Sequence, residues 1–129
     1  MEKRIIIAPD APEPIGPYSQ GVQAGNLLFI SGQVALNPKT GTVDARDIFE
    51  ETHQVMHNLR SVLHAAGLDF QHIVKTTIFL TDMSLFTSVN EVYGKYFNGS
   101  FPARETVQVS ALPRFVNVEI SMIASTDKS

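Results

Sequence analysis

A helical stripe of apolar residues constrains the fold of this chain more than any other feature of its sequence. Its members recur at i, i+4, i+7, i+8, i+11, i+14, i+15 and i+18, and they are Ile48, Thr52, Val55, Met56, Leu59, Val62, Leu63 and Ala66. This spacing draws one broad apolar face along a helix, and such a face packs against another element. Asp44 or Asp47 is available as the N-cap of the helix, and Gly67 can end it.

Short apolar stretches on both sides of this helix predict β-strands. They are residues 3–7 (KRIII), 73–80 (IVKTTIFL), 105–109 (ETVQV) and 115–124 (FVNVEISMIA). Residues 18–33 predict a hairpin that turns at Gly25-Asn26. The last two strands flank SALPR, which is short enough to join an antiparallel pair.

A second helix is predicted after Asp82 or Ser84, either of which can cap it. Its apolar face consists of Leu85, Phe86, Val89, Val92, Tyr93, Tyr96 and Phe97, and Asn98-Gly99 ends it. The order of elements is then three strands, helix, strand, helix and two strands. It predicts an α+β fold in which two helices cover one face of a sheet, in a single domain of residues 1–129 with a polar tail from about residue 125.

Composition excludes several classes of function. The 129 residues carry a net charge of −3, and no Lys/Arg cluster exceeds Lys3-Arg4, so binding to nucleic acid is not favoured. The sequence has no cysteine, which removes disulfides, thiolate nucleophiles and cysteine zinc sites. No apolar run is long enough to span a bilayer or to serve as a signal peptide, so we expect a cytosolic protein without a membrane partner.

The segment HQVMH, from His53 to His57, is similar to a zinc-protease helix but lacks its general base. Gln54 stands where that motif has glutamate, and an amide cannot take a proton from metal-bound water. Both histidines belong, with Arg60 and His64, to a stripe opposite the apolar one, which predicts that they face solvent. We therefore expect no metal site. Glycine-rich phosphate loops and a serine nucleophile elbow are also missing from the sequence.

The last strand alternates between apolar residues and the polar residues Asn117, Glu119 and Ser121. A solvated sheet face is the simplest interpretation. If residues 105–109 pair with this strand and both valine faces lie against the helices, then Arg104, Thr106 and Gln108 share its polar face. A guanidinium and a carboxylate on one uncovered face form a candidate site, which another subunit would have to cover.

Several motifs resemble the reactive intermediate deaminase A (RidA) family. They are IGPYSQGV, ISGQVALNPKTG, AAGLDFQHIVKTTIFLTDM, VNEVYGKYF, FPARETVQV, ALP and VEISMIA, and they extend from about residue 5 to residue 124 in the family's order. The resemblance implies a chorismate-mutase-like fold and a homotrimer with three clefts between subunits. It also implies hydrolysis of reactive 2-imino acids (2-iminobutanoate and 2-iminopropanoate) to 2-keto acids and ammonia, without a metal or an organic cofactor.

The same resemblance assigns roles to residues of this chain. Arg104 would bind the substrate carboxylate, Glu119 would orient or deprotonate the attacking water, and the phenol of Tyr18 would lie in the cleft. Four further residues would line the substrate site: Ser31, Gly32, Gln33 and Asn90. Thr106 stands where several members have cysteine, and its backbone would still contact substrate.

Two other functions are compatible with this resemblance. The first is a non-catalytic trimer that uses Arg104 to bind a keto acid or an amino acid. The second is a ribonuclease or translation inhibitor, which the acidic balance of the chain disfavours. Retention of Arg104, Tyr18 and Glu119 together favours the enzyme.

Overall fold

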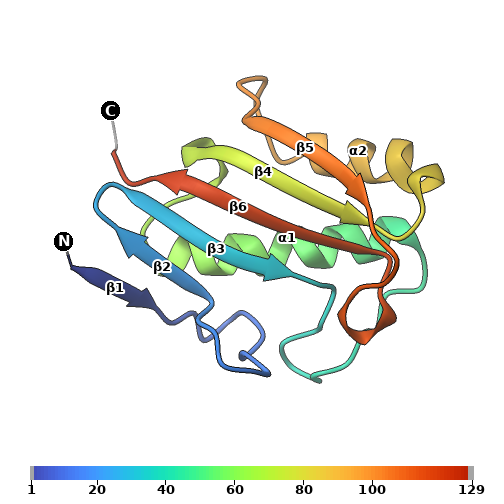
Figure 1. The fold of residues 1–129 in the computed structure, drawn as a ribbon, viewed down its shortest axis with the longest axis horizontal. Coiled ribbons are helices and arrows are strands. Elements are labelled where there is room, and N and C mark those ends of the chain that lie inside the picture. The colour runs from blue at the N-terminus through green and yellow to red at the C-terminus, as the bar shows by residue number, and fades with distance from the viewer. Residues whose placement is uncertain (1, 128–129) are drawn as a thin grey trace.

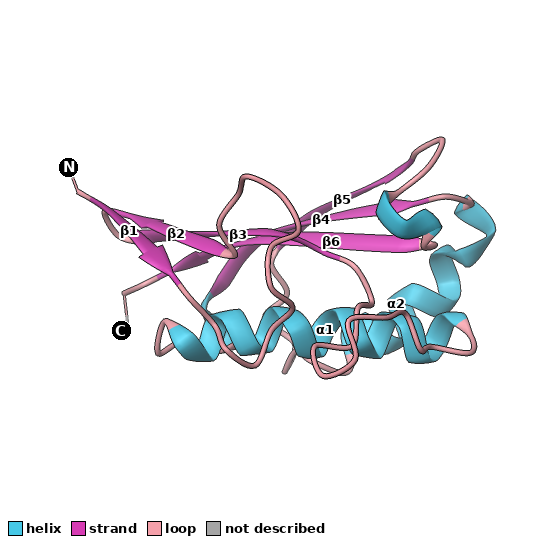
Figure 2. Ribbon diagram, turned by 90° about the horizontal axis from the view of Figure 1, so that it is seen from below, coloured by secondary structure: helices cyan, strands magenta, loops and turns pink. Residues whose placement is uncertain are grey.

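The computed structural model describes residues 2–127, in which six strands form one mixed sheet in the order β1-β2-β3-β6-β4-β5. Both helices lie on the same side of this sheet (Figures 1 and 2). The strands are β1 (Lys3–Ile6), β2 (Gly21–Ala24), β3 (Leu27–Gln33), β4 (Ile73–Leu80), β5 (Ala103–Gln108) and β6 (Val118–Ser125), and the helices are α1 (Ile48–Ala65) and α2 (Phe86–Gly94). The α+β arrangement predicted from the order of elements is confirmed.

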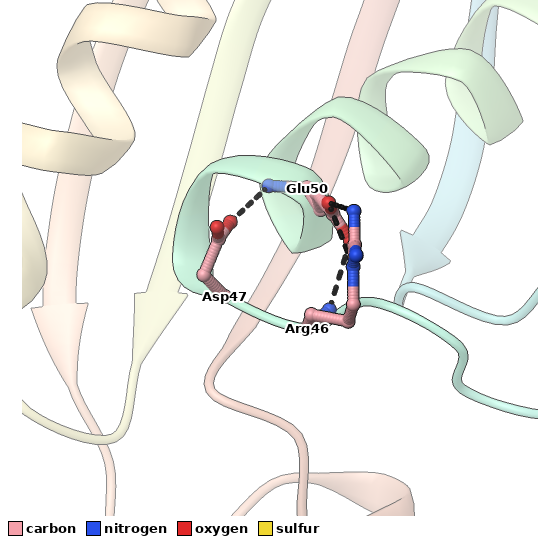
Figure 3. A network of polar contacts seen from close by, with 3 residues as sticks. All are labelled: Arg46, Asp47 and Glu50. Atoms are coloured by element: carbon pink, nitrogen blue, oxygen red, sulfur yellow. Dashed lines mark hydrogen bonds and ion pairs between the residues drawn. The ribbon is translucent and has the colours of Figure 1, made fainter.

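Helix α1 begins at a side-chain cap. The carboxylate of Asp47 accepts a hydrogen bond of 2.8 Å from the backbone N–H of Glu50, and Arg46 pairs with the Glu50 carboxylate at 2.8 Å (Figure 3). Of the two predicted caps, Asp47 is therefore the one used, while Asp44 accepts hydrogen bonds from the hydroxyls of the preceding turn. The helix ends before Gly67, whose φ of +76° is a left-handed conformation that suits glycine.

The apolar stripe of α1 is buried against the sheet, as predicted. Five hydrophobic residues of this stripe are completely buried: Val55, Met56, Leu59, Val62 and Leu63. They belong to one core cluster with Leu28, Ile78 and Ile120 from β3, β4 and β6. Burying each such side chain contributes roughly 1.5–3 kcal/mol to the free energy of folding.

Two polar side chains of α1 also attach the helix to the sheet. The buried carboxylate of Glu51 accepts hydrogen bonds from the backbone N–H groups of Asn117 and Val118, at 2.8 and 3.0 Å, and from the Asn117 side chain at 2.8 Å. The buried amide of Asn58 donates to the carbonyl oxygens of Val34 and Leu36. The start of β6 and the end of β3 are therefore both held against α1.

The predicted pairing of the last two strands is wrong. β5 pairs with β4, in parallel, and β6 lies between β3 and β4, antiparallel to both. Adjacent parallel strands need a crossover connection, and α2 supplies it between β4 and β5. The short link of residues 109–117 passes the end of β4. The N–H of Val109 donates to the carbonyl oxygen of Leu80, and the N–H of Thr81 donates to the carbonyl oxygen of Asn117.

Helix α2 is shorter than its apolar pattern predicted. Asp82 caps a 3₁₀ turn, Met83–Leu85, by accepting from the N–H of Ser84, and the α-helix that follows ends at Gly94. Tyr96 and Phe97 lie beyond this end but still pack against the core.

The predicted polar tail partly joins the sheet. Ser125 is the last residue of β6, and the N–H of Thr126 donates to the carbonyl of Asn26 in the β2–β3 turn at 2.9 Å. The side-chain amide of Asn26 also donates to the carboxylate of Asp127. The rest of the predicted tail, residues 128–129, lies outside the described residues.

The stripe of α1 that was predicted to face solvent does so only in part. His57 and His64 are exposed, whereas His53 and Arg60 are half-buried. The Nδ1 atom of His53 lies 2.7 Å from the hydroxyl of Tyr96, and the Arg60 guanidinium lies 5.1 Å from the centre of the same ring. This side of α1 therefore packs against the segment that follows α2. Among residues 2–127, no helix is long and apolar enough to cross a membrane.

Candidate functional site

The register of β5 determines which side of the sheet Arg104 faces. Arg104 pairs with Thr76 and Thr106 pairs with Ile78, both of which are completely buried on the helix side of β4. Paired residues of neighbouring strands point to the same side of a sheet. Arg104 and Thr106 therefore face the side of α2, together with Gln108. The prediction that they share a face with Glu119 is wrong.

Arg104 enters a pocket between β5 and α2, which we call the Arg104 pocket. Its volume is about 290 Å³, and it is lined by Asn90, Tyr93, Gly94, Phe101, Pro102 and Arg104. The Nη1 atom of Arg104 donates a hydrogen bond of 2.7 Å to Oδ1 of Asn90. The guanidinium carbon lies 5.2 Å from the ring centre of Tyr93 and 5.5 Å from that of Phe86, within the range of a cation–π interaction.

Glu119 lies on the opposite side of the sheet, on the open face that the helices do not cover. Its neighbours along β6, Val118 and Ile120, are completely buried on the helix side, so the alternation predicted for this strand is confirmed. Glu119 itself is half-buried, and this burial raises the pKa of its carboxyl group above the ordinary value. A carboxyl group with a raised pKa is a better proton acceptor once it is ionised.

The carboxyl group of Glu119 contributes to a second pocket, which we call the Glu119 pocket. Its cavity of about 60 Å³ is lined by Pro12, Glu13, Ile15, Tyr18, Gln20, Gly32, Gln33, Val34, Leu36, Pro113 and Glu119. Tyr18, Gly32 and Gln33, predicted from the resemblance, therefore lie with Glu119. The backbone at Gly32 lies so close to Glu119 that a Cβ atom there would be 2.9 Å from the carboxyl carbon.

The loop that carries Tyr18 is held by its neighbour Gln20. The buried side chain of Gln20 accepts from the N–H of Ala8 and donates to the carbonyl oxygens of Ala8 and Pro12. Ser31 reinforces this arrangement, because its N–H donates to the Gln20 carbonyl at 3.0 Å. Ser31 therefore holds the loop in place and does not line the Glu119 pocket.

Thr106 lies in neither pocket. Its hydroxyl oxygen is buried on the helix side of β5 and has no hydrogen-bond partner among residues 2–127. Its neighbour Glu105 faces the open side and pairs with Lys75 at 3.5 Å. The side chain of Thr106 therefore packs on the helix side of β5, and its backbone belongs to an edge strand of the sheet.

Two groups at the pockets were not predicted from the sequence. Phe86 and Tyr93 were assigned to an apolar helix face, and only the register of β5 shows that they also hold the Arg104 guanidinium. Gln20 was assigned no role from the sequence. Its place between the loop that contains Tyr18 and a predicted strand is the signal that could have indicated a side chain anchoring that loop.

Fold and pockets together define a small α+β protein with an arginine pocket that suits an anion and a separate pocket built around a carboxyl group. A model of the family described as Endoribonuclease L-PSP matches residues 8–126. The chain belongs to this family, which is the RidA family that its motifs resemble.

Similar proteins cover nearly the whole chain. Protein DfrA of Myxococcus xanthus is 54% identical over 126 residues, with 96% of each chain covered. The 2-iminobutanoate/2-iminopropanoate deaminase of Mus musculus is 49% identical, with 95% of this chain and 90% of the mouse protein covered. The structure of E. coli TdcF with bound serine has a TM-score of 0.92 at 39% identity, and 96% of this chain and 99% of that one are covered.

Proposed function

We propose that this protein is an imine deaminase that hydrolyses 2-imino acids, 2-iminobutanoate and 2-iminopropanoate among them, to 2-keto acids and ammonia. The observation that carries the proposal is the Arg104 guanidinium, held in an open pocket with one hydrogen bond, to Asn90, among residues 2–127. Its other N–H groups are available for two parallel hydrogen bonds to a carboxylate. The deaminase name of the mouse relative agrees with this chemistry.

The two pockets of one subunit open on opposite sides of the sheet, so they cannot act on one small molecule within that subunit. A complete site therefore needs Arg104 from one subunit and Glu119 from another. The open face suits such an assembly, because it carries exposed apolar residues: Ile5, Phe29 and Val107 are each more than 40% exposed. We propose a homotrimer in which the edge strand β5 of each subunit, with its Arg104 pocket, lies against the open face of the next subunit, so that three clefts form.

Catalysis in such a cleft requires positioning and one base. Arg104 binds the carboxylate and places the imine carbon beside a water molecule held by Glu119. Glu119 takes a proton from this water as its oxygen attacks the carbon, which gives a carbinolamine. The proton taken from water passes to the imine nitrogen. The carbinolamine hydroxyl then gives its proton to Glu119, which passes it to the nitrogen; as the C=O bond forms the C–N bond breaks, so ammonia leaves and the 2-keto acid remains. Imines hydrolyse readily in water, so neither a metal nor an organic cofactor is needed.

A coupled assay tests this function. An amino-acid oxidase generates imino acids in the presence of semicarbazide, which traps them as semicarbazones. We expect the protein to reduce semicarbazone formation and to increase the yield of 2-keto acid in proportion to its concentration. The Arg104→Ala variant is the inactive control, because it retains the fold and loses the carboxylate partner. An unchanged semicarbazone yield would reject the deaminase function.

A trimer that binds a keto acid or an amino acid without catalysis is the second candidate, and the serine bound to E. coli TdcF favours it. The same assay separates the two, because a binding module would show affinity for 2-ketobutyrate without effect on semicarbazone yield. The ribonuclease named in the family description has less support, since the net charge is −3 and the chain has no basic stripe. A cytosolic location remains a prediction from the sequence.

A further inference from the structure

The buried phenol of Tyr93 connects the Arg104 pocket to the neighbouring strand β4. Tyr93 is 4% exposed, and its hydroxyl donates a hydrogen bond of 2.9 Å to Oγ1 of Thr76, which is completely buried in β4. Thr76 is also the residue that pairs with Arg104 across the β4–β5 ladder. The contacts therefore form a closed loop, from the Arg104 backbone through Thr76 and Tyr93 to the Arg104 guanidinium.

The contacts in this loop together restrict the conformation of the Arg104 side chain. The hydrogen bond to Thr76 fixes the far end of the Tyr93 ring, and helix α2 fixes its near end. The face of the ring attracts the guanidinium, and Asn90 accepts one of its N–H groups from the same helix. A free arginine side chain loses rotamer entropy when it binds a ligand, and an arginine that is already held loses less.

We infer that Tyr93 is a positioning residue of the Arg104 pocket, and that its hydrogen bond to Thr76 sets the guanidinium in place before the substrate carboxylate arrives. This inference rests on the proposed function in one respect, namely that Arg104 binds a carboxylate. It assigns to Tyr93 no chemical step. Tyr93 acts through Arg104, so its loss weakens carboxylate binding more than it slows the hydrolysis of bound imine.

The loop can be tested from both ends. Tyr93→Leu removes the ring and the hydroxyl. Tyr93→Phe keeps the ring and removes its anchor, and the double variant Tyr93→Phe/Thr76→Val removes both hydroxyls without leaving either one unpaired in the core. Tyr96→Leu is the matched control, because it removes a second tyrosine ring that lies over a different arginine, Arg60.

Two measurements report on the inference. The first is the ¹⁵N relaxation of the Arg104 side-chain Nε group, which measures its order without any ligand. The second is the Kd of 2-ketobutyrate by calorimetry. We expect Tyr93→Leu to lower the order of Arg104 and to raise the Kd about tenfold, with a smaller rise, about twofold to threefold, in Tyr93→Phe and in the double variant. Tyr96→Leu should leave both quantities at the wild-type value.

The inference is overturned if Tyr93→Leu keeps both the wild-type order of Arg104 and the wild-type Kd. If Tyr93→Leu does not fold, the double variant decides, since it retains the ring and the packing of the core. Wild-type values of both quantities in the double variant would then reject the role of the Thr76 hydrogen bond. Failure of the proposed function gives a different result, because wild-type protein would then neither bind 2-ketobutyrate nor hydrolyse imines. The relaxation of the Arg104 side chain, which needs no ligand, would still test the role of Tyr93.

Discussion

The carboxyl group of Glu119 lies directly against the backbone of Gly32. A Cβ atom at Gly32 would be 2.9 Å from the carboxyl carbon and 3.1 Å from the preceding carbon of the side chain, distances shorter than ordinary van der Waals contact. Glycine at this position therefore allows the half-buried carboxyl group to occupy the Glu119 pocket. The SGQ motif and the last strand, far apart in the sequence, meet at this contact.

Gly32→Ala should displace the Glu119 side chain from its pocket. We expect imine hydrolysis to fall more than tenfold, with a stability loss of about 1 kcal/mol because the side chain can move toward solvent. Activity and urea unfolding of the same variant measure the two effects. In a Glu119→Ala background the substitution at Gly32 should change activity little, because its target is gone. Additive losses in the double variant would show that Gly32 does not act through Glu119.

The raised pKa of Glu119 has consequences for the pH dependence of activity and stability. If the ionised carboxylate accepts the proton, kcat/KM should fall on acidification at a pH above the ordinary glutamate pKa of about 4.3. The contribution of Glu119 to folding stability has the opposite pH dependence. The folded state disfavours ionisation, so stability is highest below the unfolded pKa and is lost as the pH rises through the folded one.

Glu119→Gln removes both of these pH dependences. Rate profiles of the wild type and of this variant test the first, and urea unfolding between about pH 4 and pH 8 tests the second. We expect the variant to bind 2-ketobutyrate through Arg104 while its turnover drops strongly. Full turnover with glutamine in place would exclude Glu119 as the base.

Arg104→Lys should lose most of the imine hydrolysis, because an ammonium group cannot form two parallel hydrogen bonds with a carboxylate. Its affinity for 2-ketobutyrate should fall about tenfold or more, since charged hydrogen bonds contribute roughly 1.5–3 kcal/mol each. Arg60→Lys is the matched control, as Arg60 also lies over two aromatic rings but outside both pockets. A fully active Arg104→Lys variant would contradict bidentate binding.

Glu51→Ala should destabilise the protein by about 2–4 kcal/mol, measured by urea unfolding. The substitution leaves the N–H groups of Asn117 and Val118 without their acceptor at the start of β6, where the first is part-buried and the second is buried. Activity should fall as well, because Glu119 directly follows this anchor. Glu50→Ala, which removes a neighbouring exposed carboxylate, should cost much less. Equal losses in the two variants would reject the anchoring role of Glu51.

Val107→Asp should prevent assembly. Val107 is 41% exposed on the open face of the edge strand β5, so a carboxylate there would be buried without a partner if a neighbouring subunit covers this strand in a trimer. Sedimentation or light scattering should give a trimer mass for the wild type and a smaller mass for the variant, which should also lose activity. Val43→Asp, in the loop before α1, should leave the mass unchanged. A wild-type monomer at micromolar concentration would remove the proposed inter-subunit site.

Local periodicity determined most of the elements. The α1 stripe, the strand of residues 73–80 and the hairpin at Gly25-Asn26 are where the sequence placed them, because a helical or alternating pattern depends only on near neighbours. The alternation of β6 likewise identified Glu119 as facing away from the helices. Every second residue of β6 is buried, so a shift by one residue would expose its apolar side chains. The side of the sheet that Glu119 faces therefore follows from the pattern.

Only the tertiary structure decided where β5 lies and which way Arg104 points. The alternation of residues 103–109 shows that Arg104 and Thr106 share a face, but it cannot show which face the helices cover when both faces carry polar and apolar residues. That choice depends on long-range pairing: the crossover through α2 places β5 parallel to β4, and its register sets Arg104 beside Thr76. This pairing of β5 with β4 has no signal in the local sequence, and it places Arg104 and Glu119 on opposite sides of the sheet within one chain.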